Sequence, residues 1–151
     1  MRTIELTQGY TAFVDDEDFE RLSEYKWRAQ KALRNVYAVT GNIVGMHRVV
    51  MGVKDSDIQV DHIDHNGLNN QKYNLRLCTS VQNSHNQRKR ARVCSSKFKG
   101  VNSSHEGKWE ARIRVGNGKR IRLGTFTTEI EAAEAYKSAA ETLHGEFICL
   151  I

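Results

Sequence analysis

Hydrophobic and polar residues alternate in several short stretches near the start of the chain. The clearest stretches are residues 3–6, 10–14 and 36–39. Such alternation is typical of strands that bury one face and expose the other. Between them, four acidic residues at 15–18 precede Phe19, and acidic side chains favour the first turn of a helix. Residues 1–55 are therefore predicted to form a small β-rich segment with one short helix.

The middle of the chain combines short apolar runs with many Asp, Asn and His residues. Two strands are predicted at 60–63 and 74–78, joined by a loop that is rich in Asn and Gly. Thr79 or Ser80 is suited to cap a helix that begins at Val81. The pattern predicts a compact strand–loop–strand–helix (ββα) unit. Because this unit is too small to fold on its own apolar burial, we expect it to pack on the preceding segment.

The last third of the chain has the most regular alternation. From 108 to 115, apolar residues occupy one face and charged residues the other, and a Gly-Asn-Gly turn at 116–118 leads into a second strand. The exposed face of this hairpin is predicted to carry four arginines, namely Arg112, Arg114, Arg120 and Arg122. Thr127 or Thr128 is predicted to cap an Ala-rich helix that ends at Gly145.

The net charge of +5 is unevenly distributed along the chain. Residues 88–124 hold twelve Lys and Arg residues against Glu106 and Glu110, whereas the residues on either side are net acidic. A solvated surface needs no such excess, and like charges on neighbouring strands repel each other. The segment is therefore typical of a surface that binds a polyanion such as nucleic acid.

The composition excludes several classes of protein. With 151 residues, of which 39% are hydrophobic, the chain has too little apolar material for a deep small-molecule pocket. No run of about 18 apolar residues is present, so we expect no membrane partner. The three cysteines are scattered without metal-binding spacing, which predicts a reducing compartment such as the cytoplasm.

Four segments of the C-terminal part resemble a known DNA-binding domain. They are residues 98–101, 107–113, 120–126 and 131–136. In this order they are similar to the plant ethylene-response-factor (Apetala) domain. The resemblance implies a three-stranded antiparallel sheet packed on one helix, with the sheet in the DNA major groove. The plant members carry a tryptophan-bearing segment where this chain has residues 103–106, so their target sequence does not carry over.

The resemblance also predicts which residues contact DNA. Carried over by position, the predicted contacts are Lys99, Asn102, Arg112, Arg114, Arg120 and Arg122. Arg88 and Arg90 are added on charge, because arginine binds the phosphate groups of DNA. An RNA-binding role is disfavoured, since the pattern lacks exposed aromatic residues on which bases would stack.

Asp61 and His62 are adjacent at the start of the Asn-rich loop. A carboxylate can hold Mg²⁺ or Mn²⁺ together with an amide oxygen, for which Asn83 is the candidate. His62 would then deprotonate a water molecule, while Asn74 would hydrogen-bond the other ring nitrogen and fix the tautomer. Neighbours on a regular strand point to opposite faces, so the pair can serve one site only at a strand end or a strong twist. Taken alone, an ordinary polar loop explains these residues equally well.

The same residues resemble the HNH nuclease family, in the form found in homing endonucleases of phages and introns. The matching segments are residues 61–64, 69–70, 74–75 and Asn83. The resemblance implies that His62 is the general base and that Asn74 orients it. It also implies that Asp61 and Asn83 bind the metal ion.

Two details qualify this resemblance. The third motif position is Asn83 instead of His, a replacement that the family contains, and His85 and Asn86 are the alternative ligands. Residues 46–51 are similar to the segment that precedes the motif in these nucleases. Within that segment, Arg48 is expected to approach a phosphate group.

Together these patterns predict an α+β protein with four parts. They are an N-terminal β-rich segment (1–55), a ββα-metal HNH nuclease unit (56–90), a basic linker (91–96) and an Apetala-like DNA-binding domain (97–151). We therefore expect a site-specific endonuclease of homing type that uses Mg²⁺ or Mn²⁺ to hydrolyse double-stranded DNA. It is expected to act as a monomer on DNA, without a small-molecule substrate, in the cytoplasm of a bacterial or phage-infected cell. The alternative is a DNA-binding regulator whose nuclease motif has decayed.

Overall fold

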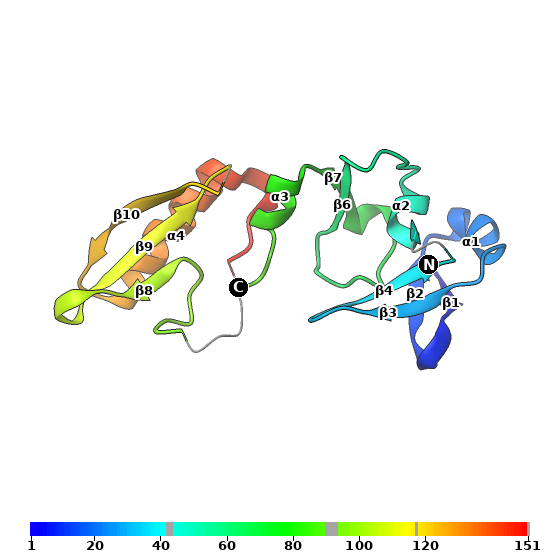
Figure 1. Ribbon diagram of the computed structural model, residues 1–151, viewed down its shortest axis with the longest axis horizontal. Coiled ribbons are helices and arrows are strands. Elements are labelled where there is room, and N and C mark those ends of the chain that lie inside the picture. The colour runs from blue at the N-terminus through cyan, green and yellow to red at the C-terminus, as the bar shows by residue number, and fades with distance from the viewer. Residues whose placement is uncertain (42–43, 90–93, 117, 151) are drawn as a thin grey trace. The chain divides into compact units, whose positions relative to one another are not determined.

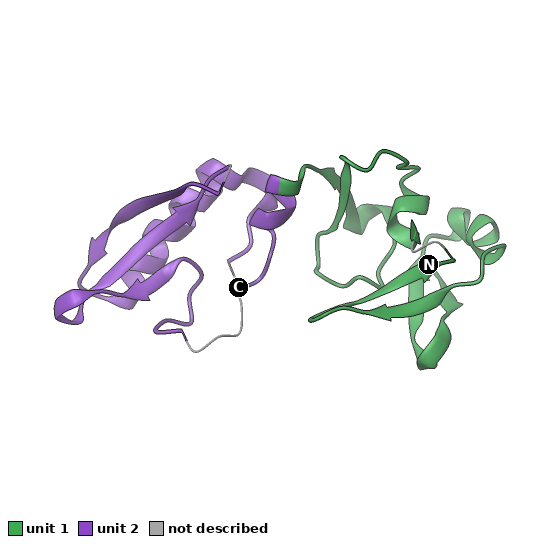
Figure 2. Cartoon of the chain, viewed as in Figure 1, with its two compact units in different colours: residues 1–80 green, residues 81–151 purple. Residues whose placement is uncertain are grey.

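The computed structural model of this protein describes residues 1–41, 44–89, 94–116 and 118–150. The chain divides into two compact units, Met1–Ser80 and Val81–Ile151, and each unit has its own hydrophobic core (Figure 1, Figure 2). Helices and small antiparallel sheets occur together, so the predicted α+β class is confirmed. In the described part of the chain, every helix is too short or too polar to cross a membrane.

The first unit consists of short strands and two short helices. In chain order its elements are β1 (Arg2–Glu5), β2 (Thr11–Val14), α1 (Asp16–Ser23), β3 (Arg28–Lys31), β4 (Val36–Thr40), β5 (Val44–Gly45), α2 (Met46–Val50), β6 (Gln59–His62) and β7 (Leu75–Cys78). Two 3-10 turns, Thr7–Gly9 and Lys72–Asn74, complete it. The three sheets have the strand orders β1-β2, β3-β4-β5 and β6-β7.

The core of the first unit holds these small sheets together. Val14, Leu22 and Met46 are fully buried at its centre. Helix α1 begins with three acidic residues, as the sequence predicts, since carboxylates favour the positive end of a helix. The N-cap residue Asp15 accepts hydrogen bonds from the backbone of Lys72 and the side chain of Gln71. These bonds fasten the start of α1 to the segment between β6 and β7.

Strand β2 also holds the loop that connects β6 to β7. The backbone nitrogen of Phe13 donates to the carbonyl of Leu68, and the nitrogen of Asn70 donates to the carbonyl of Phe13, both at 2.8 Å. Backbone groups that pair in this way define the path of a loop as a strand neighbour would. The β6–β7 hairpin therefore packs on the N-terminal segment, as its small size led us to expect.

The second unit contains one sheet and one long helix. Its elements are α3 (Ser80–His85), which begins at the boundary between the units, β8 (Val101–Ser103), β9 (Trp109–Arg114), β10 (Arg120–Phe126) and α4 (Glu129–His144), with 3-10 turns at His105–Gly107 and Gly145–Phe147. The antiparallel sheet has the strand order β10-β9-β8. Ala111 and Ile113 on β9 are fully buried, as are Ala132 and Ala140 on α4. Small alanine side chains let the helix pack closely on the sheet, which confirms the predicted C-terminal architecture.

Candidate active site and candidate DNA interface

The β6–β7 hairpin carries the two central residues of the predicted active site. Across its antiparallel strands, Asp61 pairs with Arg76 and His62 pairs with Leu75. His62 is the last residue of β6, and both Asp61 and His62 are buried, with exposed fractions of 7% and 6%. The pair thus lies at a strand end, which is one of the two places where neighbouring side chains can serve one site.

The His62 ring contacts Asn70, a residue of the matched motif to which the sequence assigned no role. Its Nε2 lies 3.4 Å from Oδ1 of Asn70, which is almost completely buried. Nδ2 of Asn70 donates to the carbonyl of Leu68, and this bond turns the amide oxygen toward the ring. Because an amide oxygen only accepts, Nε2 carries the proton in this contact and Nδ1 is the unprotonated nitrogen. The arrangement selects the tautomer in which Nδ1 can accept a proton.

Other aromatic rings pack around His62. The ring of His47 lies edge-on with its centroid 5.1 Å away, and the ring of Tyr37 lies 5.9 Å away. A Cβ atom at Gly45 would collide with the His47 ring, so glycine is needed there. Burial lowers the pKa of His62, although Asn70 and nearby carboxylates oppose the shift. The burial of His62 therefore favours the neutral form that a general base requires.

Asn74, predicted to orient His62, forms its side-chain hydrogen bonds within the loop that follows β6. Its Nδ2 donates to Oδ1 of Asp64 and to the carbonyl of Asn69, both at 2.9 Å, and its Oδ1 accepts from the backbone of Asp64 at 3.0 Å. These bonds fix the conformation of the loop that carries Asn70. The role of Asn74 in orienting His62 stays a prediction. Asn74 could act indirectly, by fixing the loop whose Asn70 contacts the His62 ring.

Asp61, the predicted metal ligand, forms an ion pair with Arg76. Its Oδ2 accepts from Nε at 3.0 Å and from Nη2 at 2.8 Å. Both side chains are largely buried, so the carboxylate charge is balanced inside the protein. Arg76 was not predicted for the site, and the only signal for it is its position across the strand pair from Asp61.

The donor atoms near β6 fit a hard divalent ion. Asp61 supplies a carboxylate oxygen, the ligand type that Mg²⁺ and Mn²⁺ prefer. Within the described ranges, no group of three or more His, Cys, Asp and Glu side chains could hold a metal ion. Mg²⁺ usually keeps several waters and needs only one or two protein ligands beside substrate phosphate. The residues present therefore suit such an ion better than a structural zinc ion.

Asn83, the predicted second ligand, lies on α3 in the second unit. Its part in metal binding stays a prediction. Of the alternative ligands, Asn86 is buried, and His85 stacks on His144 of the same unit, with ring centroids 3.7 Å apart and an angle of 15° between the planes. The packing of His85 against α4 makes it the less suitable alternative.

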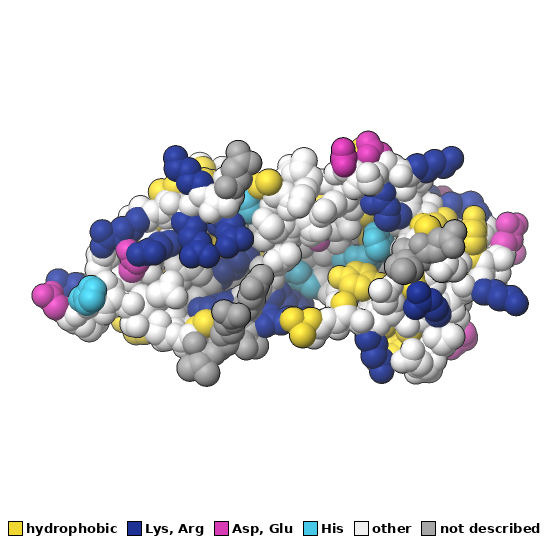
Figure 3. Space-filling view, in the orientation of Figure 1, with side chains coloured by type: hydrophobic (Ala, Val, Ile, Leu, Met, Phe, Trp, Pro, Cys, Tyr) yellow, Lys and Arg dark blue, Asp and Glu magenta, His cyan; other side chains and the backbone are white. Residues whose placement is uncertain are grey.

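The arginine face of the second unit divides into two pairs. Glu110 forms ion pairs with Nε of Arg112 and with Nε of Arg122, each at 2.6 Å. Arg114 and Arg120 lie directly opposite each other on β9 and β10, and neither has a carboxylate partner among the described residues. Lys and Arg side chains gather over this unit in the space-filling view (Figure 3). Two of the four arginines on this face therefore share one carboxylate within the protein.

Two of the other predicted DNA contacts have structural partners. The Lys99 ammonium donates to the carbonyls of His85 at 2.8 Å and Gln87 at 2.6 Å, and so closes the C-terminal end of α3. The Arg48 guanidinium donates to the carbonyls of Asp55 and Ile58 and so fastens the loop before β6. Their contacts with DNA stay predictions.

The remaining predicted contacts are dispersed over the second unit. Asn102 is exposed on β8, and Arg88 lines a cavity between α3 and the sheet. Arg90 lies outside the described residues, as do residues 91–93 of the predicted linker.

Comparison with known proteins identifies a relative that covers nearly the whole chain. An uncharacterised HNH endonuclease of Acanthamoeba polyphaga mimivirus is 39% identical over 145 residues, which are 93% of this chain and 74% of the relative. No family model matches the chain.

Plant transcription factors share a part of the chain. An ethylene-responsive transcription factor of Arabidopsis thaliana is 38% identical over 93 residues, 59% of this chain and 56% of that protein. A dehydration-responsive element-binding protein of the same plant is 54% identical over 52 residues, 34% of this chain and 25% of that protein. The shorter match has the length of a single AP2-type DNA-binding domain, which confirms the C-terminal resemblance. Because the viral relative is similar along most of its own length, the chain belongs to the HNH endonuclease family.

Proposed function

We propose that this protein is a metal-dependent endonuclease of homing type that hydrolyses a phosphodiester of double-stranded DNA. The observation that carries the proposal is the buried His62 at the end of β6, whose Nε2 contacts the amide oxygen of Asn70. Its place beside Asp61, in a chain of the HNH family, supports the role of general base.

In the proposed reaction, Nδ1 of His62 takes a proton from a water molecule whose oxygen attacks the phosphorus atom. The bond from phosphorus to the 3′ oxygen breaks, which leaves a 5′ phosphate on one fragment. The 3′ oxygen departs with the electron pair and takes up a proton from water. Asp61 and Asn83 would hold Mg²⁺ or Mn²⁺, which when bound stabilises negative charge on the phosphate and on the leaving oxygen.

The second unit supplies the proposed DNA affinity and site selection. Among the residues that the structure describes, its sheet presents Arg114 and Arg120 without carboxylate partners, and such guanidinium groups bind phosphates and guanine edges. Arg112 and Arg122 would have to exchange Glu110 for DNA. One active site per chain cuts one strand per binding event, so the monomer is expected to nick its target. The target is sought in the DNA that flanks the coding region, as expected of homing.

The test is nicking of a supercoiled plasmid that carries this flanking DNA, with Mg²⁺ present. His62→Gln is expected to lower the nicking rate at least about a hundredfold, because the general base is removed while a polar side chain remains. His105→Gln, in an exposed 3-10 turn, is the matched control and should nick at the wild-type rate. Circular dichroism verifies that both variants are folded. Wild-type nicking by folded His62→Gln would remove His62 from the mechanism.

A second pair of variants tests the contact that selects the tautomer. Asn70→Leu keeps the size of the side chain but removes the acceptor for Nε2, and it should lower the nicking rate about ten- to hundredfold. Asn70→Asp retains an oxygen acceptor and should recover part of this loss. Equal rates for the two variants would show that Asn70 does not act through the His62 ring.

A DNA-binding regulator is the second candidate function. The observation that favours it is the Arg76 ion pair, which already neutralises the Asp61 carboxylate. Gel-shift and nicking assays on the same DNA separate the two functions. Tight binding without nicking, in either Mg²⁺ or Mn²⁺, would favour the regulator.

A further inference from the structure

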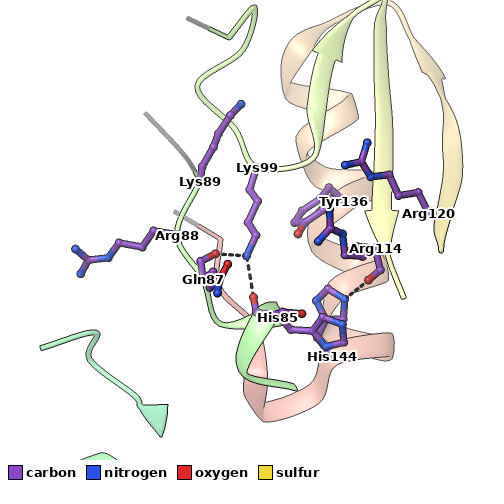
Figure 4. Close-up of a pocket in the computed structure, with 10 residues that line it drawn as sticks. His85, Gln87, Arg88, Lys89, Lys99, Arg114, Arg120, Tyr136 and His144 are labelled. Carbon is purple, nitrogen blue, oxygen red and sulfur yellow. Dashed lines mark hydrogen bonds between the residues drawn. The ribbon is translucent and has the colours of Figure 1, made fainter. Parts of the chain in front are cut away.

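A basic cavity lies in the second unit beside α3. It has a volume of about 400 Å³ and opens between the end of α3, the segment before β8, the sheet and the end of α4 (Figure 4). Its lining includes five cationic side chains, namely Arg88, Lys89, Lys99, Arg114 and Arg120. The described residues that line it include neither Asp nor Glu. A cavity with this lining repels cations and attracts anions.

The arginine pair at the cavity differs from the neighbouring pair, because it has no carboxylate partner among the described residues. Arg114 and Arg120 are directly opposite on adjacent strands, a position at which like charges destabilise a sheet. Arg112 and Arg122, the next pair along, share the carboxylate of Glu110. The described residues offer no such carboxylate to Arg114 and Arg120. An anion between the two guanidinium groups would relieve their repulsion in the way that Glu110 does for the next pair.

Lys99 is held in place at the cavity by the end of α3. Two of the three donors on its ammonium are used by the carbonyls of His85 and Gln87, as Figure 4 shows. The third donor is left for a ligand. The two bonds also orient the ammonium, so little side-chain entropy remains to be lost when an anion binds.

The stacked rings of His85 and His144 form another wall of the cavity. Nε2 of His144 donates to the carbonyl of Arg114 at 2.8 Å. Its Nδ1, and Nε2 of His85, are buried without a hydrogen-bond partner in the described protein. Buried polar atoms are rarely left unsatisfied, so this wall has hydrogen-bonding capacity that the described protein does not use.

The chemistry of the lining distinguishes between anions. A carboxylate holds two oxygens in one plane, whereas phosphorus holds four in a tetrahedron, of which a DNA diester leaves two free and a free phosphate compound three or four, with a higher charge. One guanidinium group can donate two parallel hydrogen bonds to two phosphate oxygens, and an ammonium adds a point charge. Two opposed guanidinium groups and a fixed ammonium therefore match a phosphate group better than a carboxylate.

We propose that this cavity is a binding site for one phosphate group, supplied by the backbone of DNA or by a free phosphate compound. The first source rests on the proposed function, and the second is independent of it. Three of the lining residues, His85, Arg88 and Lys89, precede the four segments, between residues 98 and 136, that carry the resemblance to the plant domain. The site joins α3 to the sheet and would place a phosphate beside the helix that carries Asn83.

The test follows the imidazole signals of His85 and His144 by NMR in the full chain during titration with inorganic phosphate. The wild type should show a saturable shift that sodium chloride at matched ionic strength does not reproduce. Arg120→Gln should weaken phosphate binding about tenfold, because a charge-assisted hydrogen bond is lost. Lys119→Gln removes a neighbouring cation outside the lining and is the matched control, expected to retain wild-type binding. Arg120 is exposed on an edge strand, and Arg114→Gln provides a second variant should Arg120→Gln fail to fold.

The same signals distinguish the two sources of phosphate. If a DNA duplex shifts them and inorganic phosphate competes, the ligand is a backbone phosphate. The slope of DNA affinity against salt concentration gives the number of phosphate contacts. Arg120→Gln should then lose about one contact more than Lys119→Gln. If inorganic phosphate saturates the site but DNA leaves the signals unchanged, the ligand is a free phosphate compound. The absence of a saturable shift with either, or an unchanged shift in Arg120→Gln, would overturn the proposal. None of these measurements depends on cleavage. A protein that binds phosphate here but does not nick DNA would therefore contradict the proposed function and leave this site intact.

Discussion

His47 is the side chain whose ionisation the fold opposes most clearly. Its Nδ1 is buried without a hydrogen-bond partner among the described residues. Burial lowers its pKa to about 3, and the neighbouring His62 and Arg48 act in the same direction. An unfolded histidine has a pKa of about 6.5. Over the interval between these values the unfolded chain binds a proton at His47, whereas the folded chain does not.

The sign of the pH effect follows from this difference. The stability due to neutral His47 is complete above the unfolded pKa and is lost as the pH falls below about 6.5. The free energy of unfolding should therefore decrease by up to about 1.4 kcal/mol per pH unit from this residue. His47→Leu should reduce the slope, measured by urea unfolding at several pH values, whereas the exposed His105→Leu should not. An unchanged slope in His47→Leu would contradict the buried, neutral state.

At the residue scale, the sequence predicts a site residue well when its partner is adjacent. Asp61 and His62 are neighbours in a strand, so the combination of carboxylate and imidazole is visible directly. Asn70 is one of several asparagines in the same loop, and only its backbone bond to Phe13 and its side-chain bond to Leu68 turn it toward the ring. Such a choice depends on contacts between distant segments, which local sequence does not show.

At the scale of elements, the first turn of α4 is stabilised by a capping residue that can be tested by substitution. The sequence left Thr127 and Thr128 as alternative caps, and the structure selects Thr128, which forms a reciprocal capping box with Glu131. Thr128→Ala should lower the free energy of unfolding by about 1 kcal/mol, because backbone donors of the first turn lose their acceptor. Thr127→Ala changes the same residue type at the preceding position and should have little effect. Thermal unfolding of the two variants measures the difference, and equal losses would contradict the assignment.

The alternation of apolar and polar residues predicts the strands but not their irregularities or their distant contacts. Alternation predicts β9 and β10 because one face of each strand is buried, but it does not predict the bulge between Arg122 and Gly124. The helix from Val81 was predicted from its cap and was found as α3. Its contact with α4 through His85 and His144 joins residues that are far apart in the sequence. No local pattern indicates that pairing.

At the scale of the whole molecule, the charge and the predicted roles are distributed between the two units. Residues 1–80 have ten basic and eleven acidic side chains, whereas residues 81–151 have thirteen basic and seven acidic ones. DNA affinity should therefore belong to the second unit, since counterion release scales with the number of cations that meet phosphates. The predicted base His62 belongs to the first unit. Efficient cleavage under the proposed function thus requires both units on one chain.

Separate expression of residues 1–80 and 81–151 tests this division of labour. Each fragment contains a complete hydrophobic cluster and should fold, as judged by circular dichroism and cooperative thermal unfolding. The 81–151 fragment should retain most of the DNA affinity and its salt dependence, measured by fluorescence anisotropy, whereas the 1–80 fragment should bind weakly. An equimolar mixture at micromolar concentration should nick at least about a hundredfold more slowly than the intact chain, because the predicted metal ligands Asp61 and Asn83 then lie on different fragments and covalent linkage supplies an effective concentration of roughly millimolar. Nicking by the mixture at the rate of the intact chain would show that DNA binding by the second unit does not deliver the first unit to its target.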